Sequence, residues 1–251
     1  MSLRVILDLN GRDVYWQMAI DEALLYLRLN NSIPDTLRIY RLRPSAVTIG
    51  YFQAIRESIN LDYLLTNRID FTRRITGGGA VYHDMNGEIT YSIVLKTQGD
   101  LVDVLDSYRI ICSGLIHALR EHNVEASFVP INDIVVSGRK ISGSAQTRRH
   151  DTLLQHGTLM YATDIDILEK TLVVPRVKLE SKGVKSIRER VVTLRDIIGE
   201  VDLDKLVKSL IKGFSKVLHR DIVIDEYREV ELRTASNILS KYRDIAWIYK
   251  R

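Results

Sequence analysis

The sequence has few cysteines, few prolines and no long hydrophobic run. Its only cysteine is Cys112, which excludes an internal disulfide framework and a cysteine-rich metal site. No apolar run approaches the roughly 20 residues that a membrane-spanning helix needs. The apolar stretch before Asp8 is interrupted by Arg4 and is too short for a signal peptide. We therefore expect a soluble, cytoplasmic protein that does not bind a membrane.

The sequence also lacks a strong excess of either charge, but its basic residues are unevenly placed. The chain carries 36 basic and 32 acidic residues, a net charge of +4. Residues 175–190 contain six basic and two acidic residues, so this segment alone accounts for the excess. It predicts a local anion site, although a solvated basic loop has the same composition. No nucleic-acid-binding motif accompanies it, so we expect no nucleic-acid partner.

The remaining composition is that of a globular protein, with 45% hydrophobic and 27% charged residues, and we expect one domain over residues 1–251. Strand-like runs occupy residues 37–41, 46–49, 69–75, 80–82, 88–95, 131–136, 140–147 and 152–161. Helical spacing is found over residues 13–30, 61–66, 101–122, 203–218 and 225–242. The strands cluster in the first two thirds without regular βαβ alternation. This order predicts an α+β sheet with flanking helices, not a doubly wound nucleotide-binding fold.

A first motif lies at residues 73–84 and reads Arg-Arg-Ile-Thr-Gly-Gly-Gly-Ala-Val-Tyr-His-Asp. The three adjacent glycines let the backbone approach a ligand closely. The motif lacks the Gly-Lys-Ser/Thr of a P-loop and the glycine spacing of a Rossmann fold. Arg74 before the turn and His83 after it place positive and hydrogen-bonding groups at one loop mouth. The alternative is a tight hairpin that merely contains flexible glycines.

A second motif lies at residues 132–146. Ser137-Gly138 predicts a hairpin turn, and Lys140 begins the strand that follows it. The small residues Ser144 and Ala145 indicate that a ligand or another backbone lies against this strand. A lysine there can neutralise a carboxylate or phosphate as a point charge. An exposed hairpin lysine is the simpler alternative.

Two further motifs complete the set of candidates. Residues 155–158 read Gln-His-Gly-Thr, and a lone strand histidine such as His156 is either structural or a ligand contact. Residues 181–190 are basic and have the composition of a mobile loop that could close over a polyanion.

Together, and in this order, the four motifs resemble the lipoate–protein ligase A family. The resemblance extends to residues 17–21 in the first helix, to residues 44–53, and to Lys241-Tyr242 with Trp247 near the end. It therefore covers nearly the whole chain. It implies the fold of biotin protein ligases and of class II aminoacyl-tRNA synthetase cores, with a mixed, largely antiparallel central sheet flanked by helices.

The resemblance also implies a two-step reaction. Members of this family use ATP and Mg²⁺ to convert lipoate to lipoyl-adenylate, and then pass the lipoyl group to a lysine of an acceptor domain. Lys140 matches the family's catalytic lysine. Positions that match lipoate and lipoyl-adenylate contacts are Arg74, Thr76, Gly77, Gly78, Gly79, His83, Ser144, Ala145 and His156. Positions that match ATP and adenylate contacts are Asn132, Asp133, Lys140, Lys182 and Lys185, with Asp133 as a magnesium ligand.

The implied acceptors are lipoyl domains of 2-oxoacid dehydrogenase complexes or the glycine-cleavage H protein. Many family members carry a further C-terminal accessory domain, whereas this sequence ends four residues after Trp247. We therefore expect a separate small accessory subunit to be needed for adenylation. The preference between lipoate and octanoate stays open.

The closest alternative is an octanoyl or lipoyl transferase of the same fold, which takes the acyl group from a carrier protein through a cysteine thioester. In such enzymes the cysteine lies shortly before the lysine strand, but residues 126–131 contain none. Cys112 falls on an apolar helical stripe, which predicts a core residue. Biotin ligation is disfavoured because the glycine motif does not match Gly-Arg-Gly-Arg. A non-enzymatic lipoate-binding module would not need Lys140 at the carboxylate.

Overall fold

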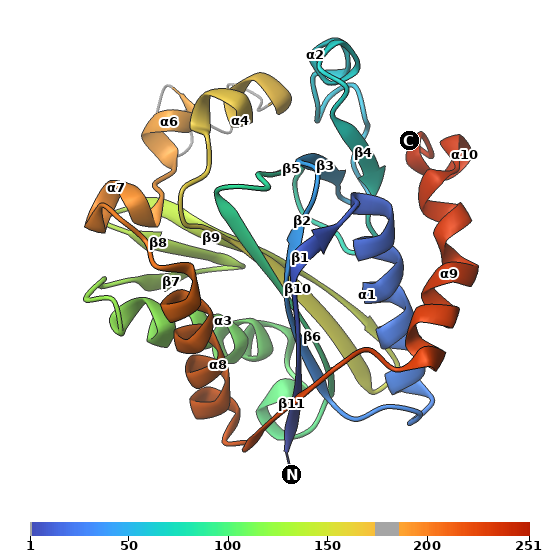
Figure 1. Cartoon of the computed structure of the whole chain (residues 1–251), viewed down its shortest axis with the longest axis vertical. Coiled ribbons are helices and arrows are strands. Elements are labelled where there is room, and N and C mark those ends of the chain that lie inside the picture. Colours follow the sequence, from blue (N-terminus) through green and yellow to red (C-terminus); the bar gives the residue numbers. More distant parts are fainter. Residues whose placement is uncertain (1, 174–185) are drawn as a thin grey trace.

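The computed structural model describes residues 2–173 and 186–251, and its centre is an eight-stranded sheet (Figure 1). The strand order is β11-β1-β2-β6-β10-β9-β8-β7. The bounds are β1 (Leu3–Arg12), β2 (Thr36–Leu42), β6 (Glu88–Lys96), β7 (Ser127–Val129), β8 (Asp133–Val136), β9 (Arg139–Arg149), β10 (Thr152–Met160) and β11 (Ile222–Asp225). Strand β1 runs parallel to β11 and β2, while the other neighbours are antiparallel. The predicted α+β fold with a mixed, largely antiparallel sheet is confirmed.

A three-stranded sheet lies above one end of the large sheet (Figure 1). Its middle strand β3 (Ala46–Ile49) pairs in parallel with β4 (Asp70–Arg73) and antiparallel with β5 (Val81–His83). Apolar residues of these strands form one core with α2 (Leu61–Thr66) and α4 (Ile165–Thr171).

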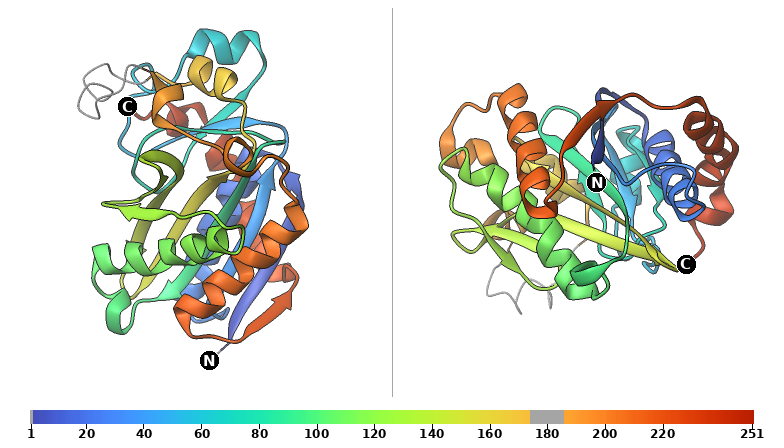
Figure 2. Two further views of the ribbon diagram at one scale, coloured as in Figure 1. Left: turned by 90° about the vertical axis from the view of Figure 1, so that its left-hand side faces the viewer. Right: turned by 90° about the horizontal axis from the view of Figure 1, so that it is seen from below.

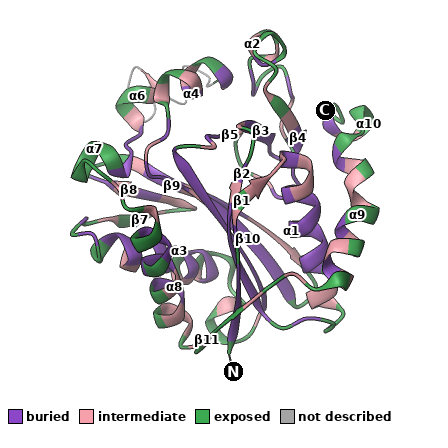
Figure 3. Cartoon of the chain, viewed as in Figure 1, coloured by how far each residue is buried: buried purple, intermediate pink, exposed green. Residues whose placement is uncertain are grey.

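Helices cover both faces of the large sheet, as the views in Figure 2 show. One face packs against α3 (Val104–Arg120) and α8 (Leu203–Leu218), and the other packs against α1 (Val14–Leu29) and α9 (Glu229–Arg243). The pleat of β6 sends Ile93 to the first core and Val94 to the second. Figure 3 shows the central strands as buried, because both faces are covered. None of the helices in the described ranges is long and apolar enough to cross a bilayer.

Two local features follow directly from the sequence. The carboxylate of Asp13 accepts a hydrogen bond from the amide of Trp16 at 2.8 Å and begins α1. Ser137 and Gly138 both have positive φ, 48° and 78°, and form the two-residue turn between β8 and β9. Right-handed strand twist favours such a turn, so the predicted hairpin is confirmed.

Other elements are absent from the sequence prediction or begin elsewhere. The additional ones are β1, β7, β11, α4, the 3₁₀ turn η1 (Gly99–Leu101), α6 (Ile187–Arg190), α7 (Leu194–Ile198) and α10 (Ile245–Ile248). The predicted start of the long C-terminal helix at residue 225 is wrong, because Asp225 ends β11 and α9 begins at Glu229. Pairing of β11 with β1 overrides the helical pattern there.

Candidate active site

A cavity of about 690 Å³ lies where the end of the large sheet faces the small sheet. This volume suits a small-molecule ligand. Much of its wall is apolar and is formed by Met18, Val81, Tyr82, Ala145, Met160, Leu168, Leu172 and Val191. Polar residues, among them Arg74, Asp133 and Lys140, form the rest. The cavity therefore suits a ligand with an apolar part and an anionic part.

Arg74 organises the glycine turn, which we define as residues 76–79. Its guanidinium donates to the carbonyl oxygens of Gly77 at 2.5 Å and Gly79 at 2.7 Å, and its Nε donates to Thr76 Oγ1 at 2.9 Å. Gly78 has a φ of 85°, in the region that favours glycine. Because the carbonyls of Gly77 and Gly79 face Arg74, the amides of the residues that follow them, Gly78 and Ala80, point away from it.

The charged guanidinium of Arg74 is buried beside the cavity. Among the described residues, no carboxylate accepts a hydrogen bond from it. Its acceptors are hydroxyl and carbonyl oxygens. Burial penalises the charged form and lowers the pKa of Arg74 to about 10, so it stays protonated at neutral pH. An uncompensated buried cation next to a cavity attracts an anionic group.

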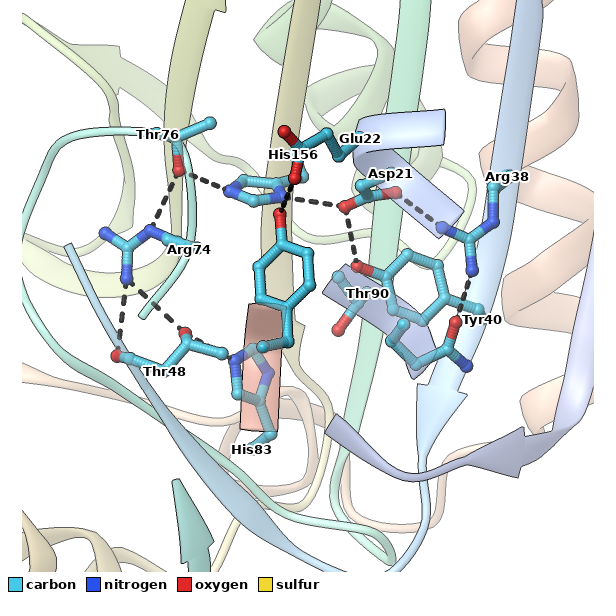
Figure 4. A network of polar contacts seen from close by, with 12 residues as sticks. Asp21, Glu22, Arg38, Tyr40, Thr48, Arg74, Thr76, His83, Thr90 and His156 are labelled. Atoms are coloured by element: carbon cyan, nitrogen blue, oxygen red, sulfur yellow. Dashed lines mark hydrogen bonds and ion pairs between the residues drawn. The ribbon is translucent and has the colours of Figure 1, made fainter. Parts of the chain in front are cut away.

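One hydrogen-bonded chain runs from Arg74 to helix α1 (Figure 4). Thr76 Oγ1 lies 2.7 Å from His156 Nε2, and His156 Nδ1 lies 2.9 Å from Asp21 Oδ2. Although burial opposes it, the charge of Arg38 and the hydrogen bond from His156 hold the pKa of Asp21 below its usual value. Burial lowers the pKa of His156. A neutral His156 therefore donates to the ionised Asp21 and accepts from Thr76.

A second hydrogen-bonded chain runs from Arg74 through Thr48 to His83, as Figure 4 shows, and continues to the start of β6. Arg74 donates to Thr48 Oγ1 at 3.4 Å, which lies 2.9 Å from His83 Nε2. His83 Nδ1 in turn lies 2.7 Å from Glu88 Oε1, and Thr90 donates to the same oxygen at 2.9 Å. Burial raises the pKa of Glu88, and the contact with His83 opposes this rise. Each chain ends on a carboxylate, so both imidazoles are held in fixed orientations.

Lys140 is part of an ion cluster on the cavity wall. Its Nζ lies 2.5 Å from Asp133 Oδ1, and Arg190 Nη2 lies 3.7 Å from Asp133 Oδ2. The side chains of Lys140, Asp133 and Arg190 are 28%, 21% and 27% exposed, so the cluster faces solvent on one side. Such a lysine can leave one carboxylate for another with little desolvation.

Gly143 provides the space for the Lys140 side chain. A Cβ atom at position 143 would lie 2.4 Å from Lys140 Nζ and 2.6 Å from its Cε. A β-bulge at Ile134/Val135 pairs Val135 with Lys140 but Asp133 with Gly143. The extra residue shifts the alternation of β9. As a result, Lys140 and Gly143 line the same cavity.

Asn132 and Ser144 connect β9 to the chain before β8. Asn132 donates from its side-chain amide to the carbonyl of Ser144, whose own amide donates to the carbonyl of Asn132 at 3.0 Å. Both residues line the cavity. They fix the spacing of the two strands that carry Asp133 and Lys140.

Cys112 lies on the far side of this strand pair from the cavity. It is 1% exposed on α3, and its Sγ lies 3.5 Å from Ser144 Oγ. Burial raises its pKa to about 11. Cys112 does not belong to the described lining of the cavity. The prediction that it is a core residue is confirmed.

The structure brings most of the predicted site residues together. The cavity lining contains Arg74, Gly78, Gly79, His83, Asn132, Asp133, Lys140, Ser144, Ala145 and His156. Thr76 and Gly77 lie behind it, where they hold Arg74 and His156. Lys182 and Lys185 lie outside the described residues, as does the first half, residues 181–185, of the loop predicted to close over a polyanion.

Sequence reasoning did not assign roles to several residues of this site, namely Asp21, Thr48 and Glu88. Asp21 stands among apolar residues on the buried side of α1, and that pattern is a signal for a paired buried charge. Glu88 stands at the first position of a strand that is buried throughout, which is a similar signal. Neither signal identifies the histidine partner.

The α+β fold encloses a cavity with an apolar wall and cationic side chains, which suits the binding of a small amphipathic anion. The chain belongs to the family described as the lipoyl protein ligase A/B catalytic domain, whose model matches residues 13–215.

Curated relatives of both kinds are similar to this chain. Lipoate-protein ligase A subunit 1 of Thermoplasma acidophilum is 36% identical over 89% of this chain and 87% of its own length. Octanoyltransferase LipM of Brevibacillus brevis is 30% identical over 93% of this chain and 94% of its own length.

Solved structures share the fold along nearly the whole chain. A bi-partite lipoate protein ligase from T. acidophilum, described together with its E2 lipoyl domain, is 33% identical, has a TM-score of 0.86, and is matched over 99% of this chain and 96% of that one. A T. acidophilum protein with bound lipoic acid is 30% identical, with a TM-score of 0.84 and coverage of 99% and 100%. A lipoate-protein ligase A bound with ATP is 30% identical, with a TM-score of 0.85 and coverage of 99% of each chain.

A more distant likeness concerns the fold alone. The biotin protein ligase of Aquifex aeolicus is 15% identical, has a TM-score of 0.50, and is matched over 86% of this chain and 70% of that one. The predicted likeness to the biotin protein ligase fold is therefore confirmed.

Proposed function

We propose that this chain activates lipoate with ATP and transfers the lipoyl group to a lysine of a lipoyl domain. In the first step, a carboxylate oxygen of lipoate attacks the α-phosphorus of ATP, and the bond to pyrophosphate breaks. In the second step, the lysine amine attacks the acyl carbon of lipoyl-adenylate. AMP leaves, and the amine loses a proton as the amide forms.

The position of Cys112 is the observation that carries this choice. A transferase needs a thiolate whose sulfur can bond to the acyl carbon. The only cysteine of the chain is buried on α3, and its raised pKa of about 11 keeps it a thiol at neutral pH. The segment 126–131, where a transferase of this fold carries its nucleophile, has no cysteine. This arrangement favours direct activation of the carboxylate.

Lys140 is the residue to which we assign the main catalytic role. Its ammonium lies on the cavity wall beside Asp133 and Arg190, in reach of a carboxylate or phosphate oxygen. A fixed cation stabilises the charge that develops on the acyl phosphate in both transition states. The buried charge of Arg74 supplies a second attraction for an anionic substrate group.

We assign Arg74, Gly78, Gly79, His83, Ser144, Ala145 and His156 to the lipoyl moiety, and Asn132 and Asp133 to the nucleotide. Solved relatives bound to lipoic acid and to ATP support both ligands as substrates. Mg²⁺ in such sites relies on substrate phosphates and needs only one or two protein carboxylates. The described residues contain no cluster of three metal-binding side chains, which fits this mode, and Asp133 would be the protein ligand. The ion would neutralise phosphate charge.

The relatives support a proposal for the acceptor and for an accessory subunit. The T. acidophilum ligase is bi-partite and is described with an E2 lipoyl domain. We infer that this chain likewise modifies a lipoyl domain of a 2-oxoacid dehydrogenase complex or the glycine-cleavage H protein. We also infer that it uses a second polypeptide for adenylation, and that it acts in the cytoplasm.

Octanoyl transfer from an acyl carrier protein is the second candidate function, because LipM octanoyltransferases are about as similar to this chain as the ligase subunit is. It would require Cys112, or a nucleophile other than cysteine, to reach the acyl carbon. The two functions therefore differ in their donor and in their dependence on Cys112.

Mass spectrometry of an apo lipoyl domain separates the two functions. The wild-type chain and Cys112→Ser are each incubated with one of two donors, synthetic lipoyl-adenylate or octanoyl-acyl carrier protein. We expect both proteins to modify the domain from the adenylate at rates within about twofold, because a buried thiol contributes no chemistry. Modification from the carrier protein that disappears in Cys112→Ser would overturn the ligase assignment.

A further inference from the structure

Arg73 precedes the arginine of the active site and faces away from the cavity. It is 0% exposed, and burial together with the nearby charge of Arg251 lowers its pKa. The cavity lining of the described residues includes Arg74 but not Arg73. The proposed function therefore gives this buried cation no role.

The guanidinium of Arg73 donates to two segments that are far apart in the sequence. One is the rim loop, which we define as residues 50–53: Nη1 donates to the carbonyls of Gly50 at 2.8 Å, Tyr51 at 3.1 Å and Gln53 at 2.8 Å. The other is helix α10, where Nε donates to the carbonyl of Trp247 at 3.2 Å and Nη2 donates to that of Ile248 at 2.9 Å.

The side chain of Trp247 also contacts Arg73 and the rim loop. Its Nε1 donates to the backbone carbonyl of Arg73 at 2.7 Å, and its ring lies 5.7 Å from that of Tyr51. The link between α10 and the rim loop thus uses both side chains and both backbones. A planar guanidinium with five donors suits this cluster of carbonyls, whereas a lysine ammonium has three donors on a single atom.

Helix α10 also contacts α9, which is bound to α1. Lys241 donates to both carboxylate oxygens of Glu22 on α1 at 2.8 Å, and Tyr242 donates to the same carboxylate at 2.7 Å. The ammonium of Lys241 lies 4.2 Å from the centre of the Trp247 ring. Lys241, Tyr242 and Trp247 therefore join helices α1, α9 and α10 outside the described lining of the cavity.

The rim loop in turn contacts the glycine turn directly. Tyr51 donates its amide to the carbonyl of Thr76 at 2.8 Å. The backbones touch so closely that a Cβ at Gly50 would lie 2.0 Å from the carbonyl oxygen of Gly78. Phe52 and Gln53 of the rim loop line the cavity themselves. A shift of the rim loop would therefore change the cavity wall at two places.

We propose that Arg73 is a positioning residue, which ties helix α10 to the rim loop and so holds the glycine turn in the form that receives the acyl substrate. Its effect on lipoate binding rests on the proposed function, whereas its effect on the rim loop does not. Arg73 acts through the carbonyls that it binds, and its removal acts on substrate affinity more than on chemistry.

The test compares Arg73→Lys with a matched control, Arg148→Lys. Arg148 also donates to several backbone carbonyls, those of Leu101, Val102 and Asp103, but does not belong to the described cavity lining. Lipoate affinity is measured by calorimetry, and hydrogen exchange is followed in peptides covering the rim loop and the glycine turn. Each full-length variant is studied at the same interval below its own Tm.

In Arg73→Lys we expect exchange in both peptides to rise at least tenfold and the Kd for lipoate to rise at least tenfold. In Arg148→Lys we expect both quantities within twofold of wild type. Where Arg73→Lys does not fold, Trp247→Phe tests the same link, with exchange in the rim loop expected to rise about threefold.

Unchanged exchange in the rim loop and glycine turn of a folded Arg73 or Trp247 variant would overturn the inference, even with a lowered Tm. A wild-type chain that binds no lipoate would contradict the proposed function but not the inference about Arg73. In that case the exchange measurement still decides the role of Arg73, since it needs no ligand.

Discussion

Single residues show how closely the reactive groups of this site depend on their neighbours. Lys140 carries the charge, but the absent side chain of Gly143 determines where that charge lies. The two residues belong to the same cavity wall because of the β-bulge between them in β9. A change at Gly143 therefore tests the position of the ammonium without removing it.

We predict that Gly143→Ala reduces lipoyl transfer about 10- to 100-fold while it changes the free energy of unfolding by less than about 1 kcal/mol. The new methyl would lie 2.4 Å from Lys140 Nζ, the end of a flexible side chain, so the lysine moves rather than the backbone. Single-turnover transfer from lipoyl-adenylate and urea unfolding measure the two quantities.

Lys140→Ala is the reference for this prediction and should reduce transfer about 10²- to 10³-fold, the usual effect of losing one preorganised electrostatic contact. The double variant should be no slower than Lys140→Ala, because Gly143 acts through the lysine. Additive losses in the double variant would contradict this coupling. They would show that Gly143 contributes to the site independently.

Sequence reasoning predicted the cationic and imidazole groups of the site but not their partners. Arg74, His83, Lys140 and His156 stand in short motifs whose chemistry can be recognised locally. Asp21, by contrast, contacts His156 across 135 residues of sequence. No local pattern contains such a pair, so the fixed orientation of the histidine required the structure.

Among the elements, the long helices and the strands around the motifs were predictable, and the sheet edges were not. Helix α8 and strand β6 follow clear helical or strand patterns, and their bounds agree closely with the structure. Strand β11 has four residues and exists because β1 offers it a parallel partner. A strand that short carries little periodic signal of its own.

The crossing of α3 and α8 gives a prediction at this scale. Gly213→Ala should destabilise the protein by about 2 kcal/mol, despite the gain of about 1 kcal/mol in helix propensity. The added Cβ would lie 2.0 Å from the carbonyl oxygen of Gly114, a backbone atom that can move only with its helix. Thermal and urea unfolding measure the loss.

Lys208→Ala, at an exposed position of the same helix, is the control and should change stability by less than about 0.5 kcal/mol. Since both changes introduce alanine into α8, the comparison isolates the close approach of the helices. A stabilised Gly213→Ala protein would mean that α3 and α8 separate without loss of packing.

At the scale of the whole molecule, the two steps of the proposed reaction place different demands on the charges of the cavity. Adenylation must bring the carboxylate of lipoate against the triphosphate of ATP, and both are anions. Transfer joins a neutral amine to a mixed anhydride. In the described part of the chain, the cavity is lined by three cationic side chains, Arg74, Lys140 and Arg190, and the last two share Asp133. The first step therefore has the greater need of added cations and of shielding from water.

We predict that the chain alone transfers the lipoyl group from synthetic lipoyl-adenylate. Its release of pyrophosphate from ATP and lipoate should be at least about 100-fold slower than this transfer. A difference of about 2.7 kcal/mol between the two activation barriers is enough to give that ratio. The likeness to subunit 1 of a bi-partite ligase supports this division. Pyrophosphate release and lipoyl-domain mass are measured in parallel on one preparation, with Lys140→Ala as the blank. Equal rates of the two steps in the isolated chain would show that its own residues supply the charge and shielding that adenylation requires, and that no second polypeptide is needed.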